Sequence, residues 1–468
     1  MKSALPVLAA DPGVRLGFGG AVESDPAART AEPQGGAAGE FVPHVVAWNL
    51  TKRCNLECAH CYIAAGNWQS AADELSTAEC LRIADEIFAV SPAPMFILSG
   101  GEPLLRTDLE RIAEHASGRG ATVVVGTNGT RLTADRIGSL QDGGVTGVAV
   151  SIDSLNERYH DRFRHGGGAL RDTLDAVERL RAAKLDFVVQ TSLTRGNRAE
   201  IASLAAWAAD RGAVSFNVYF LVATGRGENM QGLSPAENDE VLRELVTLER
   251  EYRGRMLVRS KCQPQIMRHA WETDPDSPLL NYGTRCPCGV HYCRITPDGK
   301  LTPCPYLPLA AGDLRAQPFG EVWQTSPVLA RIRSSEPGGK CGGCEYRGIC
   351  GGCRARAYAD TGDVMAEDAS CAYVPPGDRV LVRTARPVTY GQATPSSEML
   401  WSEAARARLQ RVPGFVRGVV SQRIEKFARD RGYTQITPEV MEAVRRELPV
   451  DFSKKAPFFL NTDGAGRP

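Results

Sequence analysis

The sequence has no net charge: among its 468 residues, 55 lysine and arginine residues balance 55 aspartate and glutamate residues. Bulk electrostatics therefore give no reason to expect a nucleic-acid or membrane-surface partner. No stretch reaches the roughly 20 apolar residues that a membrane-spanning helix needs, so we expect no membrane span. The first ten residues hold one lysine and an apolar run that Pro6 interrupts, which is too short for a secretory signal.

Fourteen cysteines stand out against this composition. A secreted disulfide framework is excluded by the length of the chain, because such frameworks stabilise short domains. Most of the cysteines instead lie at close spacings typical of metal or cluster ligands, which favours a reducing compartment. We therefore expect a cytoplasmic protein, and its length allows two or three domains.

The chain opens with a predicted leader and an α/β core. Residues 1–40 are rich in Ala, Gly and Pro and lack periodicity, so we predict a flexible leader. In residues 41–225 apolar runs alternate with amphipathic helices, and the predicted strands are 44–50, Met95–Ser99, Ala121–Gly126, Thr146–Ile152, Asp186–Leu193 and Ser215–Leu221. Six βα units predict a partial (β/α)6 TIM-like barrel whose active site lies at the C-terminal ends of the strands.

Capping motifs mark the starts of three predicted helices. Ser76-x-x-Glu79 and Thr107-x-x-Glu110 are typical of capping boxes. Ser234, followed by proline at the first helical position, opens a helix within residues 226–285, which we predict to be a helical connection. Cys262 lies alone in this connection, and we expect it to be a buried thiol.

Three cysteines, Cys54, Cys58 and Cys61, follow the first predicted strand at the spacing C-x3-C-x2-C. Three thiolates are too few to close a metal site, but a four-iron cluster bound by three keeps one iron free to chelate a small molecule. The motif resembles that of the radical S-adenosylmethionine (SAM) superfamily. In that family a [4Fe-4S] cluster holds SAM and splits it into methionine and a 5′-deoxyadenosyl radical, and the resemblance places His60 near the adenine. A structural zinc site or buried free thiols are the alternatives.

The resemblance extends to residues at the ends of the second and fourth strands: Gly100, Gly101, Glu102, Ser151 and Asp153. It implies that the first three hold the SAM amino group and that the last two contact the ribose hydroxyls or the methionine moiety. Ser151 and Asp153 are equally suited to cap the next helix. Residues 160–164 are predicted to form a charged strand-to-helix connection at the same mouth, either functional or a solvated loop.

Nine cysteines crowd into the Gly- and Pro-rich residues 286–376, and packing does not explain this density. The region resembles the SPASM auxiliary iron–sulfur domain, with two short strands about a turn at 295–301. The resemblance implies one [4Fe-4S] cluster bound by Cys341, Cys344, Cys350 and Cys371, for which tetrahedral zinc is the alternative. It implies that a second cluster, if present, is bound by Cys288, Cys304 and Cys353 with either Cys286 or Cys293.

A predicted linker, 377–400, leads to a small all-helical domain at 401–455 and a tail at 456–468. Residues 412–448 resemble the C-terminal module of light-independent protochlorophyllide reductase. Eight Lys and Arg residues lie between Arg406 and Arg431, against two acidic residues, Glu425 and Asp430. These arginines either pair with the carboxylates of a ligand or form a solvated helix face.

Together these resemblances predict an enzyme, a radical SAM oxidoreductase or lyase that modifies a tetrapyrrole side chain by hydrogen abstraction. The closest resemblance is to radical SAM proteins of the heme d1 and siroheme-dependent heme routes. We expect an electron donor such as ferredoxin or flavodoxin. A maturase that modifies a peptide or protein is the alternative, because many enzymes with this auxiliary domain act on peptides. A non-enzymatic electron carrier or zinc-binding protein is disfavoured, because neither needs SAM-binding residues at successive strand ends.

Overall fold

A computed structural model describes residues 41–275, 277–282, 285–382, 399–410, 412 and 414–447. The predicted leader, most of the predicted linker and the predicted tail lie outside the described residues. Among the residues that are described, no helix is long and apolar enough to cross a membrane.

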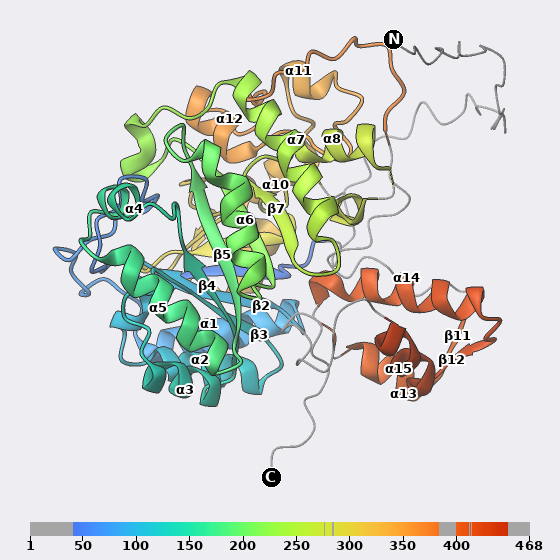
Figure 1. Ribbon diagram of the computed structural model, residues 1–468, viewed down its shortest axis with the longest axis horizontal. Coiled ribbons are helices and arrows are strands. Elements are labelled where there is room, and N and C mark those ends of the chain that lie inside the picture. The colour runs from blue at the N-terminus through green and yellow to red at the C-terminus, as the bar shows by residue number, and fades with distance from the viewer. Residues whose placement is uncertain are drawn as a thin grey trace, which may run out of the picture. The chain divides into compact units, whose positions relative to one another are not determined.

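One mainly parallel sheet organises the described chain (Figure 1). Its strands are β1 (Val45–Thr51), β2 (Met95–Gly100), β3 (Thr122–Thr127), β4 (Val145–Ser151), β5 (Asp186–Leu193), β6 (Ser215–Phe220), β7 (Leu257–Lys261), β8 (Tyr292–Ile295), β9 (Lys300–Thr302) and β10 (Gly312–Asp313). Their spatial order is β10-β9-β8-β1-β2-β3-β4-β5-β6-β7. The strands from β8 through β7 pair in parallel, and β9 and β10 extend the β8 edge in antiparallel fashion.

The six predicted strands correspond to β1–β6, which confirms the partial (β/α)6 barrel. Two further parallel strands flank it, with β7 beside β6 and β8 beside β1. No pairing joins β7 to β8 in the described part of the chain, so the barrel stays open between them. The helical connection predicted at 226–285 contains the helices α7 (Pro235–Tyr252) and α8 (Ile266–Thr273) but also the strand β7. The sequence did not indicate this strand, because only Val258 of its five residues is buried and no apolar alternation marks it.

Helices follow the core strands and cover the outer face of the sheet (Figure 1). They are α1 (Thr77–Val90), α2 (Leu109–Gly118), α3 (Ala134–Asp142), α4 (Glu157–Arg164), α5 (Ala169–Ala182), α6 (Ile201–Asp210), α7 (Pro235–Tyr252) and α8 (Ile266–Thr273). The capping box predicted at the start of α1 is confirmed, and so is the helix start at Ser234, where α7 also has a capping box between Ser234 and Glu237. The box predicted at Thr107 is wrong: Asp108 precedes α2 without capping it, because its carboxylate accepts hydrogen bonds from Arg106 and Thr77.

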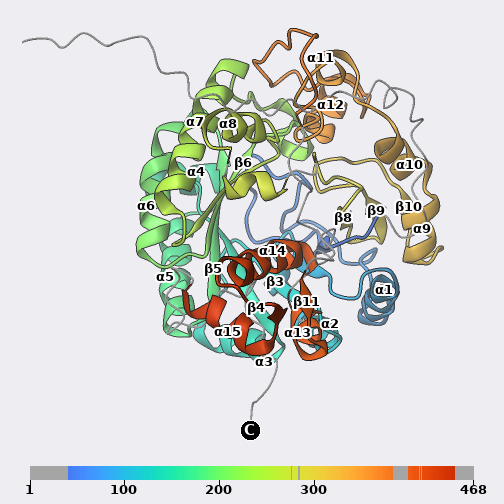
Figure 2. The same ribbon diagram turned by 90° about the vertical axis from the view of Figure 1, so that its right-hand side faces the viewer.

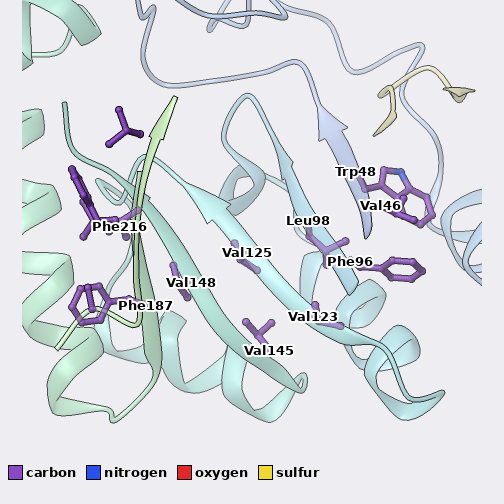
Figure 3. Close-up of a cluster of buried hydrophobic side chains, with 14 of the residues drawn as sticks. Val46, Trp48, Phe96, Leu98, Val123, Val125, Val145, Val148, Phe187 and Phe216 are labelled. Atoms are coloured by element: carbon purple, nitrogen blue, oxygen red, sulfur yellow. The ribbon is translucent and has the colours of Figure 1, made fainter. Parts of the chain in front are cut away.

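The two faces of the core sheet differ in character. Side chains such as Trp48, Phe96 and Phe216 stand on the helix-facing side and are fully buried (Figure 3). Burial of each large apolar side chain contributes roughly 1.5–3 kcal/mol. Because side chains alternate along a strand, the residues between them face the barrel interior. That inner face is apolar near the strand starts, as at Val124, and polar near the strand ends, as at Asn49.

The cysteine-rich domain is joined to the core through the sheet. The predicted hairpin is confirmed as β8 and β9, and β8 also pairs with β1, with Val45 opposite Tyr292. The domain's helices are α9 (Phe319–Thr325), α10 (Pro327–Ser334), α11 (Gly339–Gly342) and α12 (Arg354–Thr361). Figure 2 shows α9 and α10 beside the β8–β10 edge.

The C-terminal domain has its own core. Its elements are β11 (Leu400–Trp401), α13 (Glu403–Gln410), α14 (Gly414–Asp430), β12 (Gln435–Ile436) and α15 (Pro438–Glu447). Trp401, Ile424 and Ile436 are among the side chains buried there. The buried carboxylate of Glu425 accepts a hydrogen bond from the Trp401 indole at 3.1 Å. One of the two acidic residues in the basic stretch is therefore a core residue.

Candidate active site at the C-terminal ends of the strands

Arg226 holds the cysteine loop that follows β1. Its side chain donates from Nε to the carbonyl oxygen of Cys58 at 2.8 Å and from Nη1 to that of Ala65 at 2.7 Å. Its main-chain N–H donates to the carbonyl oxygen of Cys61 at 3.0 Å. Arg226 lies in the 3-10 turn Gly225–Asn229, soon after β6. The connection after the sixth strand therefore fixes the loop after the first.

Each sulfur of this loop accepts a hydrogen bond from nitrogen. The main-chain N–H of Leu56 donates to Cys54 Sγ at 3.4 Å, and that of Ala65 donates to Cys61 Sγ at 3.3 Å. Burial raises the pKa of Cys54 to about 12, so a thiolate there needs a nearby positive charge. The donor set fits an iron–sulfur cluster, whose iron supplies that charge and whose potential responds to such N–H contacts.

Arg164 joins the sulfur of Cys58 to Asp153. Its Nη1 lies 3.9 Å from Cys58 Sγ, and its Nε donates to Asp153 Oδ2 at 2.7 Å. The main-chain N–H of Ser192 donates to the other carboxylate oxygen at 2.8 Å. Burial opposes ionisation of Asp153, but the Arg164 charge outweighs it and lowers the pKa of Asp153 to about 2. Asp153 thus anchors Arg164, whose segment is the helix α4 and not the predicted loop.

Neither Asp153 nor Ser151 caps the helix that follows. Asn156 does so, accepting a hydrogen bond from the main-chain N–H of Tyr159 at 3.1 Å. Ser151 is the last residue of β4 and is half-buried. By the alternation of the strand it faces the barrel interior, on the side of Asn49.

His60 lies on an aromatic stack supplied by α4. Its ring is parallel to Phe163, with 4.5 Å between the centroids, and Phe163 stacks in turn on Tyr159. Burial lowers the pKa of His60 to about 4, so the imidazole is neutral at physiological pH. Its Nδ1 is buried and has no hydrogen-bond partner among the described residues. The position near the adenine stays a prediction.

The Gly-Gly-Glu segment packs against the cysteine loop. A Cβ on Gly100 would lie 2.4 Å from the carbonyl oxygen of Thr51, and one on Gly101 would lie 2.2 Å from that of Arg53. Only glycine permits this approach. The buried carboxylate of Glu102 accepts a hydrogen bond from Thr127 Oγ1 at 2.8 Å. It also accepts from the main-chain N–H of Leu104, after β2, at 3.1 Å and from that of Asn128, after β3, at 2.9 Å. Burial raises its pKa, and the carboxylate ties the ends of β2 and β3 together.

The auxiliary cysteines form two groups. Cys341, Cys344, Cys350 and Cys371 line one small cavity of about 30 Å³, and a cluster shared by these four thiols stays a prediction. Main-chain N–H groups donate to two of these sulfurs, from Asp368 to Cys341 at 3.4 Å and from Gly352 to Cys350 at 3.5 Å.

The second group contains Cys286, whose side chain hydrogen-bonds with those of Cys288 and Cys353, while Cys288 also contacts Cys304. Cys293 lies apart in the main core, so the structure does not bring it to this group. The physical reason is strand alternation: the neighbours of Cys293 on β8 face the barrel interior, and Cys293 faces the helices. Cys262 is half-buried and packs against the second group, which sequence spacing did not indicate.

Tyrosines lie between the first cysteine loop and the second auxiliary group. Asn49 donates to the hydroxyl of Tyr62 at 2.7 Å, and the Tyr62 ring lies 5.0 Å from that of Tyr306. Tyr306 also lies 6.4 Å from Tyr219 on β6. These three rings, which we call the tyrosine wall, come from three distant parts of the sequence, so no local motif could have revealed them.

Comparison with known proteins agrees with this geometry. Residues 48–208 match the family model of the radical SAM superfamily. An AdoMet-dependent heme synthase from Methanosarcina barkeri is 39% identical over 71% of this chain and 97% of its own length. The chain belongs to the radical SAM superfamily. A pre-heme d1 synthase from Dinoroseobacter shibae is 29% identical over 70% of this chain and 85% of its own length.

The other parts of this radical SAM enzyme also match. Residues 286–353 match the SPASM iron–sulfur cluster-binding domain, and 401–445 match a domain described as the proto-chlorophyllide reductase 57 kD subunit. The fold matches that of Streptococcus suis SuiB bound to SAM, with a TM-score of 0.59 and 14% identity over 71% of this chain and 78% of SuiB. The enzyme therefore uses SAM and a [4Fe-4S] cluster, and its SPASM domain binds auxiliary iron–sulfur.

Proposed function

We propose that this radical SAM enzyme abstracts hydrogen from a side chain of a tetrapyrrole in a heme-type biosynthetic reaction. The observation that carries the proposal is the 39% identity to an AdoMet-dependent heme synthase across nearly the whole of that relative. A relative named for pre-heme d1 synthesis supports the same substrate class. A ferredoxin or flavodoxin is the proposed electron donor.

The proposed roles follow from the contacts of each residue. Cys54, Cys58 and Cys61 ligate the cluster, which when bound supplies the electron that splits SAM. Arg226 fixes the cysteine loop through the carbonyl oxygen of Cys58. Arg164 links the sulfur of Cys58 to the carboxylate of Asp153. The SAM-binding residues are proposed to be Gly100, Gly101, Glu102, Ser151, Asp153 and His60. The carboxylates of Glu102 and Asp153 already accept hydrogen bonds from other residues of the protein. Their main contribution is therefore to shape the SAM site.

We propose two auxiliary clusters. One is ligated by Cys341, Cys344, Cys350 and Cys371, and the other by Cys286, Cys288, Cys304 and Cys353. In both groups the thiols gather in one place. In the first group burial raises the pKa of Cys350, so an uncompensated thiolate there is costly. Metal analysis of the purified protein should give iron and sulfide well above one four-iron cluster and little zinc.

SAM cleavage by anaerobic protein tests the assignment of the first cluster. Replacing Cys54 with Ala should abolish 5′-deoxyadenosine formation. Cys80→Ala is the matched control, because Cys80 is equally buried but lies in α1. Cleavage at the wild-type rate in the Cys54 variant would disprove the assignment.

Titration with siroheme-derived and iron-free tetrapyrroles tests the substrate class. We expect a Soret shift and substrate-dependent 5′-deoxyadenosine formation with at least one of them. The same titration on a variant ending before residue 400 asks whether the C-terminal domain contributes to binding. Absence of any shift, together with turnover of a peptide encoded beside this gene, would replace the tetrapyrrole proposal by a peptide maturase.

A further inference from the structure

Lys261 is the last residue of β7 and lies on the inner wall of the barrel. It pairs in register with Tyr219 on β6, so both side chains leave the sheet on the same face. Tyr219 belongs to the tyrosine wall, which reaches the cysteine loop through Tyr306 and Tyr62. The amine of Lys261 therefore stands at the end of an aromatic surface that begins beside the proposed SAM site.

Lys261 has no hydrogen-bond or ion-pair partner among the residues that the structure describes. The charged and ionisable groups that act on it are Arg259, on the same strand, and the Cys262 thiol. No carboxylate is among them. Burial, followed by the Arg259 charge, lowers the pKa of Lys261 to about 7. The side chain of Lys261 is half-buried. A partly desolvated amine without an anion is unfavourable, and such groups are typical of sites where a ligand supplies the missing charge.

The opposite edge of the open barrel also presents a cation. Arg294 on β8 pairs in register with Ala47 and shares the inner face with Tyr292. It donates to Thr302 Oγ1 at 3.0 Å and to the carbonyl oxygen of Pro305 at 2.9 Å, both of them uncharged acceptors. The barrel is open between β7 and β8, and each of these strands carries a cationic side chain on its inner face: Lys261 on β7 and Arg294 on β8. The tyrosine wall lies between these two residues.

We propose that Lys261 binds a carboxylate of the substrate and so orients the macrocycle along the tyrosine wall. The inference rests on the proposed tetrapyrrole substrate, whose several carboxylate side chains and flat aromatic surface match a cation beside aromatic rings. It makes Lys261 a determinant of substrate specificity, with no part in SAM cleavage.

Replacement of the lysine tests this in the anaerobic holoenzyme. Lys261→Met should weaken binding of the tetrapyrrole that wild-type enzyme turns over by about 10- to 100-fold, as expected for loss of a charged hydrogen bond. Lys261→Arg should stay within about 5-fold, because the charge remains. Lys184→Met is the matched control, since Lys184 is exposed in the turn before β5, at the other end of the barrel. Basal SAM cleavage should be equal in all four proteins.

Esterified substrates identify the interacting group. Methylation of the carboxylate that contacts Lys261 should weaken binding to wild-type enzyme as much as Lys261→Met does, and should cost the Met variant nothing further. If wild-type enzyme turns over a tetrapyrrole and the Met variant binds it equally tightly, the Lys261 inference is wrong while the proposed function stands. If wild-type enzyme binds no tetrapyrrole, the proposed function fails and the inference falls with it.

Discussion

Replacement of Arg164 by Met tests how the cysteine loop is held. The change leaves the fully buried carboxylate of Asp153 without its ion-pair partner, and it removes the Nη1 contact to Cys58. Breaking a buried pair from one side costs about 3–5 kcal/mol, because the remaining charge stays desolvated. At about 2–4 °C per kcal/mol, the apparent melting temperature should fall by roughly 6–20 °C.

Circular dichroism under anaerobic conditions, at one scan rate, measures this shift. Arg162→Met is the matched control, because Arg162 lies on the same helix but is exposed, and its melting temperature should change by less than about 2 °C. Adding Asp153→Asn to Arg164→Met should recover part of the loss, since it removes the unpaired charge. If Arg164→Met melts within 2 °C of the control, or if the double variant is no better than the single one, Arg164 does not act through Asp153.

Three further predictions concern the clusters and the pH dependence of stability. Cys286→Ala should lower the iron content by about four atoms per chain and Cys293→Ala should leave it unchanged; equal losses would contradict the ligand assignment. Gly101→Ala should destabilise the protein by about 1–3 kcal/mol in denaturant melts, because its Cβ overlaps the cysteine loop, whereas Gly118→Ala, with open space around it, should not. Burial lowers the pKa of His160 to about 4, so the unfolded chain binds its proton first and stability falls as pH drops from about 6.5 to 4; His160→Asn should flatten that part of the pH–melting profile, and an unchanged slope would refute this.

The sequence revealed what short spacings and strand periodicity encode. The six core strands, the hairpin at 295–301, the capping box at Ser76 and the helix start at Ser234 follow from local patterns, because periodicity, turn residues and capping residues can be read within a few positions. Cys341, Cys344, Cys350 and Cys371 also gather as their spacing implies.

Features that depend on partners far along the chain were not predictable in this way. Arg164 and Arg226 contact the cysteine loop across 106 and 168 residues. The sequence placed residues 160–164 at the mouth of the barrel, but it did not indicate that Arg164 or Arg226 contacts this loop. β7 was missed because its inner side carries Arg259 and Lys261 in place of the apolar residues that identify a strand. Cys293 was retained as a possible ligand because spacing alone does not say to which face of a strand a side chain points.

The pairing of β8 with β1 has a consequence for biosynthesis of the chain. β1 begins at Val45 and β8 at Tyr292, so roughly 12–50 s pass between their emergence at a synthesis rate of ~5–20 residues per second. During that time one side of β1 has unpaired main-chain groups, which are a template for pairing with another chain. Fragments that end before residue 286 should therefore aggregate through this edge, and the nascent enzyme should need a chaperone until its cysteine-rich domain has been made.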